Sequence, residues 1–239
     1  MAERLALVTG ASRGIGYHFA KALAGEGIHV IAVARTVGGL EELDDEIQEM
    51  GGSATLVPLD LLEFEAIDRL GASLNERWGK LDILVANAGM LGGLSPVEHF
   101  EPKTFEKIFG LNVTANWRLF RSLAPLLKQA ANPRVVATVS TVQMPSKPFW
   151  GAYGASQAAL MTLVRTWATE NQKNTLKINM IDPGPIRTAL RAQAMPGEDI
   201  STLGEPAEIG NAILALCEET LSQNGKIFRN NKGIFAFED

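Results

Sequence analysis

The sequence is poor in cysteine and has only two tyrosines. Cys217 is the single cysteine, which excludes an intramolecular disulfide and any zinc site built from several thiolates. It ends an apolar run over residues 212–217, so we interpret it as a small buried core residue. No metal site is expected.

Long hydrophobic runs and excess positive charge are also absent. No apolar stretch approaches the roughly 18 residues needed to cross a bilayer, and the N-terminus lacks the charged and apolar regions of a signal peptide. The formal net charge of −5 argues against nucleic acid or an anionic membrane surface as a partner. We therefore expect a cytoplasmic protein with neither kind of partner.

What the chain does contain is an alternation of short apolar segments with longer segments of helical character. The strands predicted from this pattern cover residues 5–8, 29–34, 54–58, 83–86, 134–139, 177–181 and 226–229, and the helices cover 15–26, 40–50, 65–78, 103–129, 152–171 and 207–220. The strands are apolar without alternation, as strands covered on both faces are. The order predicts one α/β domain over residues 1–239, a doubly wound parallel sheet of about seven strands with helices on both faces.

One connection is long for such a domain. Residues 184–206 follow the predicted strand at 177–181 and mix small, apolar and acidic residues. Connections of this length are usually binding loops or lids, and this one leaves the edge where open α/β sheets bind ligands. We predict that it forms a mobile substrate lid.

A glycine-rich turn joins the first predicted strand to the first predicted helix. Residues 9–16 read TGASRGIG, so the glycines are spaced GxxxGxG rather than GxGxxG. Gly10 permits a sharp turn, while Gly14 and Gly16 let the backbone approach a pyrophosphate and the helix pack closely on the sheet. Free N–H groups and the helix dipole favour an anion there. The turn predicts a dinucleotide site; the alternative is a turn that is glycine-rich only for packing.

Further motifs accompany this turn. Residues 87–89 (NAG) follow the fourth predicted strand, Tyr153 opens a helix, and residues 182–184 (DPG) follow the sixth strand. With these motifs the chain resembles, over essentially its whole length, the short-chain dehydrogenase/reductase family of the classical type. The resemblance implies a single-domain Rossmann fold, hydride transfer between NAD(P)(H) and a small carbonyl or alcohol, and a homodimer or homotetramer. The residues that the glycine turn and the resemblance place against the cofactor are Gly10, Ser12, Arg13, Gly14, Ile15, Gly16, Arg35, Asp60, Leu61, Asn87, Ala88, Gly89, Tyr153, Gln157, Pro183, Gly184, Ile186 and Thr188.

Two arginines indicate which nucleotide is bound. NAD-selective sites carry an acid about 20 residues past the glycines, but here Arg35 follows the second predicted strand and no acid appears before Glu41. Arg35 and Arg13 can hold a 2′-phosphate by charge-assisted hydrogen bonds, which predicts NADP(H). The alternative is that both are solvated surface residues. Asp60 resembles the family position that accepts from the adenine amino group, or it is a loop aspartate.

The resemblance also implies a reaction centre. Tyr153 would transfer the proton, Ser140 would hydrogen-bond the substrate oxygen, and Asn112 would hold a water that extends the proton relay. Tyr17 lies just after the glycine turn, so Tyr153 is the sole candidate acid or base. The family's lysine, four positions after the tyrosine, is replaced by Gln157.

Gln157 shares a helix face with Tyr153 and can hydrogen-bond a ribose, but it carries no charge. A unit charge at 4–5 Å is worth roughly 3 to 4 kcal/mol to a phenolate at an effective dielectric constant of about 20, or about two to three pKa units. Its loss should impair alcohol oxidation more than carbonyl reduction, because a neutral tyrosine still donates a hydrogen bond. Lys147, in the loop before Tyr153, is a disfavoured substitute for the missing lysine.

Two functional hypotheses follow. The first is an NADP(H)-dependent oxidoreductase for a small carbonyl or alcohol, with activity weakened by Gln157. The second is a catalytically impaired member of the family that binds NADP(H) as a sensor or assembly subunit.

The predicted helices at 103–129 and 152–171 are apolar around much of their circumference, so either a second copy of the chain or the chain's own loops cover their outer side. Residues that we considered for the pocket wall are Trp150, Phe149, Met144 and 91–93; packing or interface roles are the alternative.

Overall fold

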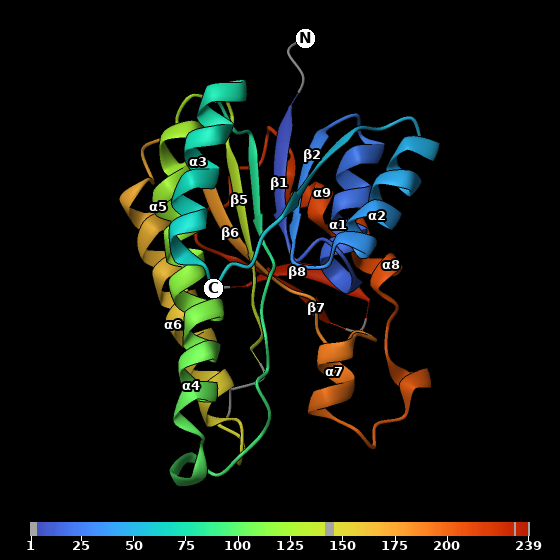
Figure 1. Cartoon of the computed structure of the whole chain (residues 1–239), viewed down its shortest axis with the longest axis vertical. Coiled ribbons are helices and arrows are strands. Elements are labelled where there is room, and N and C mark those ends of the chain that lie inside the picture. Colours follow the sequence, from blue (N-terminus) through green and yellow to red (C-terminus); the bar gives the residue numbers. More distant parts are fainter. Residues whose placement is uncertain (1–3, 142–145, 232, 239) are drawn as a thin grey trace.

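In the computed structural model the chain forms one α/β domain, described over residues 4–141, 146–231 and 233–238 (Figure 1). Within these ranges an eight-stranded sheet has the order β3-β2-β1-β4-β5-β6-β7-β8. Strands β1 to β7 are parallel, and β8 pairs antiparallel with β7. The strands are β1 (Leu5–Thr9), β2 (His29–Ala34), β3 (Ala54–Pro58), β4 (Ile83–Ala86), β5 (Arg134–Thr138), β6 (Lys177–Asp182), β7 (Ile227–Asn231) and β8 (Ile234–Glu238).

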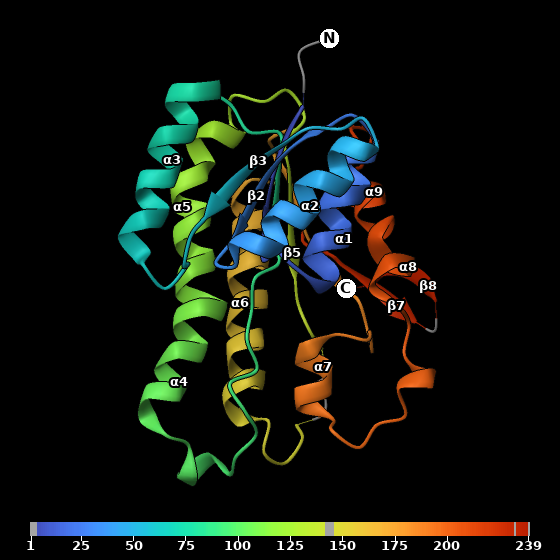
Figure 2. The ribbon, with the colours of Figure 1, turned by 45° about the vertical axis from the view of Figure 1, so that its right-hand side comes forward.

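Helices cover both faces of the sheet (Figures 1 and 2). Helices α1, α2, α8 and α9 lie on one side and α3, α4, α5 and α6 on the other. None of the helices within the described ranges is both long and apolar enough to span a membrane. The helices are α1 (Gly14–Gly25), α2 (Val37–Glu49), α3 (Phe64–Trp78), α4 (Pro102–Phe109), α5 (Asn116–Leu127), α6 (Gly151–Glu170), α7 (Ala189–Ala194), α8 (Pro206–Gly210) and α9 (Ala212–Cys217).

The core consists of two apolar layers separated by the sheet. Successive residues of β1 alternate between them: Leu7 packs with the residues of α3, α5 and α6, and Val8 packs with those of α1, α2 and α9. Each strand position therefore faces a helix layer, which is why the strand segments are apolar without alternation. The doubly wound parallel sheet is confirmed.

The sequence prediction differs from the structure at four places, one of which is the unpredicted helix α7. It missed β8, a hairpin strand whose Phe235 and Phe237 rings pack on Phe228 of β7. The helix predicted over 103–129 is α4, a π-helical segment (Gly110–Ala115) and α5. The helix predicted over 207–220 is the pair α8 and α9.

The strand order reverses between β1 and β4, which opens a crevice at their carboxyl ends. Residues 184–206 leave β6 at the same edge and contain α7 and a short 3-10 turn (Ile200–Thr202) below the sheet (Figure 1). A parallel bridge between Ile186 and Gly204 closes the base of this segment. The topology thus brings the glycine turn, the segment after β5 and the segment after β6 to one edge.

Candidate active site

A cavity of about 820 Å³ lies at the carboxyl edge of the sheet. Every residue that the sequence placed in the site lines this cavity except Gly16. These lining residues are Gly10, Ser12, Arg13, Gly14, Ile15, Arg35, Asp60, Leu61, Asn87, Ala88, Gly89, Asn112, Ser140, Tyr153, Gln157, Pro183, Gly184, Ile186 and Thr188. Residues as distant in sequence as Gly10 and Thr188 therefore share one site.

The glycine turn lies at one end of the cavity, where α1 begins. Gly10 has φ +68° and Gly14 has φ +60°, a left-handed conformation that side chains disfavour. Gly16 is needed for close packing, since a Cβ there would lie 2.4 Å from Asn87 Nδ2 and 2.5 Å from the Gly10 carbonyl oxygen. The first turn of α1 has no acidic residue to occupy its free amides. These features fit a diphosphate at the start of α1.

Buried hydrogen bonds fix the strand ends beneath this turn. Thr9 Oγ1 accepts from the backbone N–H groups of Asn87 (2.9 Å) and Ala88 (3.0 Å). The Asn87 amide donates to the Thr9 carbonyl (3.1 Å) and accepts from Thr138 Oγ1 (3.1 Å). β1, β4 and β5 are thereby joined through side chains. The sequence analysis missed Thr9 and Thr138. Each is a polar residue at the end of an apolar strand, and this position could have identified them.

Arg35 and Asp60 lie together beyond the end of β2. Arg35 is exposed, and its Nη1 is 3.7 Å from Asp60 Oδ2. Asp60 Oδ1 accepts from the Leu62 N–H (3.0 Å), so this carboxylate shapes its own loop. Arg13 is exposed at the start of α1 and lines the same cavity.

Tyr153 and Ser140 meet at the opposite, inner end of the cavity. Tyr153 is in the first turn of α6 and is only 7% exposed. Burial raises its pKa to about 12; the Ser140 hydrogen bond lowers the pKa, and the Asp182 carboxylate raises it. The Tyr153 hydroxyl is therefore a proton donor at neutral pH.

Gln157 lies one turn further along α6, and it is 5% exposed. Its Oε1 accepts from the backbone N–H of Ser140 at 2.9 Å. Lys147 is exposed and places its Nζ 6.0 Å from the centre of the Trp150 ring. None of the described residues that line the cavity is a lysine.

Asn112 lies in the π-helical segment between α4 and α5, and its side chain is hydrogen-bonded to other groups of the protein. Its Oδ1 accepts from Met90 N–H (2.9 Å), and its Nδ2 donates to the Met90 carbonyl and to Ser156 Oγ (2.9 Å each). Ser156 Oγ in turn donates to the carbonyl of Tyr153 (2.8 Å), and Asn116 Nδ2 donates to the carbonyl of Asn112 (2.8 Å). The network fixes the turn that carries Tyr153. Sequence reasoning missed Ser156 and Asn116, although an asparagine four residues after another was a signal.

Asp182 joins the two segments that border the reaction centre. It accepts from the backbone N–H of Thr141 (3.0 Å), from Thr141 Oγ1 (2.5 Å) and from the N–H of Gly184 (3.1 Å). Arg229 Nε lies 3.6 Å from the same carboxylate. The carboxylate therefore holds the segment after β5 against the segment after β6.

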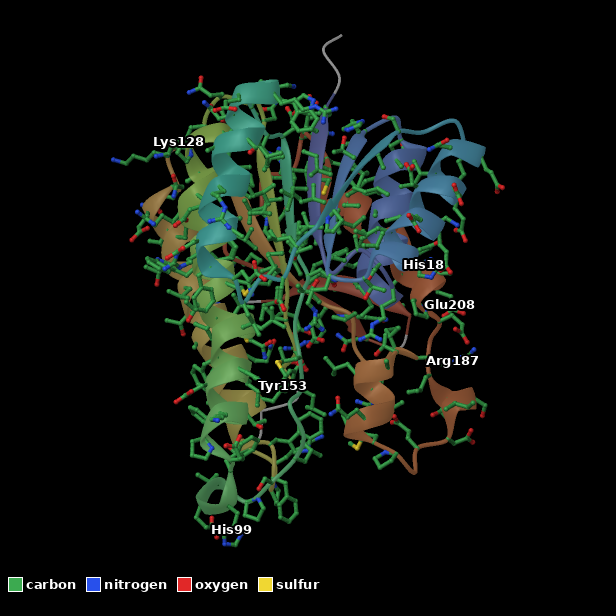
Figure 3. All side chains as sticks on the ribbon, in the orientation of Figure 1. His18, His99, Lys128, Tyr153, Arg187 and Glu208 are labelled. Atoms are coloured by element: carbon green, nitrogen blue, oxygen red, sulfur yellow. The ribbon has the colours of Figure 1, made fainter. Side chains whose placement is uncertain are left out.

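The segment 184–206 packs over the reaction centre with an apolar surface. Ala194 of α7 forms a buried cluster with Leu91, Trp150 and Tyr153, and the Trp150 and Tyr153 rings lie 6.0 Å apart. Figure 3 shows Tyr153 on the α6 side and Arg187 on the α7 side of the site. Of the residues considered for the pocket wall, Trp150 and Leu91 are in this cluster. Phe149 is 55% exposed and Met144 lies outside the described residues.

The geometry can be compared with known proteins. A family model described as short chain dehydrogenase matches residues 4–199, most of the chain. The chain belongs to the short-chain dehydrogenase family. The relative named "Uncharacterized oxidoreductase YciK" from Escherichia coli (strain K12) is 36% identical over 210 residues, which is 87% of this chain and 83% of that protein.

Solved structures of short-chain dehydrogenases superpose closely on this chain. One from Shigella flexneri 2a, complexed with NADP, has a TM-score of 0.89 at 34% identity and covers 95% of this chain and 96% of that one. Another, from Escherichia coli CFT073 and complexed with NADPH, has a TM-score of 0.88 at 34% identity and covers 95% of each chain. The resemblance inferred from the sequence is thereby confirmed for the family and for the Rossmann fold.

Proposed function

We propose that this protein is an NADP(H)-dependent oxidoreductase that acts on a small carbonyl or alcohol, chiefly as a carbonyl reductase. The observation that carries the proposal is the joint placement of the glycine turn and the hydrogen-bonded Tyr153–Ser140 pair in one cavity. The NADP and NADPH complexes of the related structures support the choice of nucleotide. The printed name of the first relative, an oxidoreductase, agrees with the reaction class.

The chain's own residues account for cofactor binding in this proposal. The backbone amides at the start of α1 receive the diphosphate, and Arg13 and Arg35 receive the 2′-phosphate. Asn87, Ala88 and Gly89 hold the middle of the dinucleotide. Asp60 and Leu61 flank the adenine, while Pro183, Gly184, Ile186 and Thr188 cover the nicotinamide end.

Nucleotide choice is open to a direct test. We expect Arg13→Ser and Arg35→Ser each to raise the dissociation constant of NADPH by about 10- to 100-fold, the value of one charge-assisted hydrogen bond of roughly 1.5 to 3 kcal/mol. NADH lacks the 2′-phosphate, so its affinity should stay the same. Fluorescence titration of both nucleotides measures this, with exposed Arg69→Ser on α3 as the control. Equal weakening of NADPH and NADH would contradict the assignment.

When bound, NADPH supplies the hydride. The Ser140 and Tyr153 hydroxyls hold the carbonyl oxygen of the substrate, and the Tyr153 O–H donates its proton to this oxygen as negative charge develops on it. The Asn112–Ser156 network keeps the Tyr153 turn in place. Residues 184–206 act as the substrate lid and exclude water through the apolar cluster around Ala194.

The pKa of Tyr153 predicts how each direction depends on pH. Below a pKa of about 12 the hydroxyl is protonated, so the rate of reduction should be flat between about pH 6 and 9. Oxidation needs the phenolate, whose fraction rises about tenfold per pH unit below the pKa. The kcat/KM for an alcohol with NADP⁺ should therefore climb through this range. A plateau of the oxidation rate near neutral pH would show that Tyr153 is far more acidic.

The lid end of the cavity favours a neutral, apolar substrate. Its two arginines are already paired, Arg187 with Glu205 at 2.7 Å and Arg191 with Glu198 through two hydrogen bonds. An anionic substrate would meet Glu205 or Glu198 beside either arginine, and these carboxylates would repel it. On this side Tyr153 packs with apolar and aromatic side chains, among them Trp150 and Ala194. Ketones or aldehydes with apolar flanks fit this surface.

We further propose that the outer side of α4 and α5 packs against a second copy of the chain in a homodimer or homotetramer. Phe105 and Trp117 are 41% and 45% exposed there, and the Phe105 ring stacks on Phe109 at 4.8 Å. Large exposed aromatic residues typically mark interaction surfaces. Light scattering should give a multiple of the monomer mass; a monomer at micromolar concentration would refute this.

The experiment that tests the reaction uses NADPH deuterated at ring carbon 4 with a panel of neutral aldehydes and ketones, each matched to a carboxylate-bearing analogue. We expect deuterium at the former carbonyl carbon of the alcohol product, with the neutral member of each pair reduced faster.

Gln157 is the observation that favours the second candidate, a cofactor-binding sensor or assembly subunit. Tight NADPH binding without deuterium transfer to any member of the panel would establish that candidate instead.

A further inference from the structure

The backbone of Ser140 lies where the β5 ladder ends. Val139 N–H still donates to the Ile181 carbonyl of the neighbouring strand (2.9 Å). The next two N–H groups turn to side chains instead: Ser140 N–H to Gln157 Oε1 (2.9 Å) and Thr141 N–H to Asp182 Oδ2 (3.0 Å). Two side-chain acceptors therefore hold the segment that carries Ser140, beyond the point where the hydrogen bonds between the strands end.

The acceptor supplied by α6 has to be a group with a lone pair. An amide oxygen accepts hydrogen bonds, whereas a lysine ammonium only donates them. Gln157 is buried and this hydrogen bond is part-buried, so a replacement without an acceptor would remove the partner that the Ser140 N–H has in the structure. The amide oxygen at this position therefore accepts a hydrogen bond that an ammonium group could not accept.

We propose that Gln157 is a positioning residue that fixes Ser140 through its amide oxygen, and that restoring a lysine here would impair the site. The proposal rests on the function proposed above, because it explains how Ser140 is held beside Tyr153. The Ser140 hydroxyl hydrogen-bonds Tyr153, so a shift of the Ser140 backbone moves one of the two groups that hold the substrate oxygen. For the position of Ser140, a hydrogen-bond acceptor at residue 157 matters more than a charge there.

Three substitutions separate these roles. Gln157→Met has similar length and no acceptor, Gln157→Lys has a cation and no acceptor, and Gln157→Glu keeps an acceptor without the amide donor. Gln129→Met, at an exposed glutamine after α5, is the matched control. Amide hydrogen exchange at Ser140, with Val139 as the internal reference, reports on the hydrogen bond in the full chain whether or not a substrate is turned over.

We expect exchange at Ser140 to accelerate about tenfold in Gln157→Met and Gln157→Lys, as the loss of one hydrogen bond predicts, and to stay slow in Gln157→Glu. The kcat for reduction should fall about 10- to 100-fold in the Met and Lys variants, the typical cost of a misplaced group. Unchanged exchange in Gln157→Met, or a kcat in Gln157→Lys at or above that of the parent protein, would overturn the proposal. A parent protein that reduces no carbonyl but shows this exchange pattern would instead overturn the proposed function and leave the hydrogen bond established.

Discussion

Tyr153→Phe is expected to lower kcat for carbonyl reduction by about 10²- to 10⁴-fold, the usual contribution of a positioned proton donor. The change removes one oxygen atom from a side chain that is otherwise packed between Trp150 and Ala194. Because the ring remains, the fold and the NADPH dissociation constant should be preserved. Stopped-flow measurement of NADPH oxidation, with the nucleotide titrated separately, checks both halves of this prediction.

Tyr17→Phe is the matched control for that experiment. Tyr17 lies on α1 and hydrogen-bonds Glu46, and it does not line the cavity. Its loss should leave kcat unchanged. If Tyr153→Phe retained more than about a tenth of the parent rate, another group would have to donate the proton and the general-acid assignment would be wrong.

Gly16→Ala is expected to damage both stability and cofactor use. The new Cβ would meet Asn87 Nδ2 at 2.4 Å and the Gly10 carbonyl oxygen at 2.5 Å, so α1 must move away from the turn. Overpacking of this kind costs about 1 to 3 kcal/mol of unfolding free energy, and displacing the phosphate-binding amides should lower kcat/KM for NADPH about 100-fold. Urea denaturation and steady-state kinetics measure the two effects.

The control for this change lies in the same helix. At Gly25 a Cβ would have Met50 Cε as its nearest neighbour, at an ordinary contact distance of 3.8 Å. Gly25→Ala should therefore leave both quantities close to those of the parent protein. Similar losses at the two glycines would contradict this account, because alanine has the higher helix propensity and the contact between α1 and the turn would then not explain the damage.

The helices and strands that depend mainly on local sequence could be predicted. Largely apolar segments identified strands β1 to β6, because a strand covered on both faces needs apolar residues at most positions. Strand β8 was missed because its pairing depends on the hairpin with β7, whose partner residues are known only once the hairpin has formed. The π-helical segment between α4 and α5 was missed because both of its flanking residues, Phe109 and Asn116, keep helical backbone angles, so that it interrupts no helical pattern.

For the site, the motifs predicted which residues share the cavity but not how those residues are held. The bonds from Thr9 to Asn87, from Asn112 to Ser156 and from Ser140 to Gln157 join residues that are far apart in sequence. Their partners follow from the topology, which brings the ends of different strands together. The sequence showed that Gln157 lacks a charge; only the structure shows what its amide oxygen binds.

The most direct test of the whole account is calorimetric titration of the purified protein with NADPH and with NADH. We predict one NADPH per chain, bound about 10²- to 10⁴-fold more tightly than NADH, because only NADPH offers a 2′-phosphate to both Arg13 and Arg35. No detectable binding of either nucleotide would contradict the assignment of the cavity to a dinucleotide, and with it every step assigned to Tyr153 and Ser140.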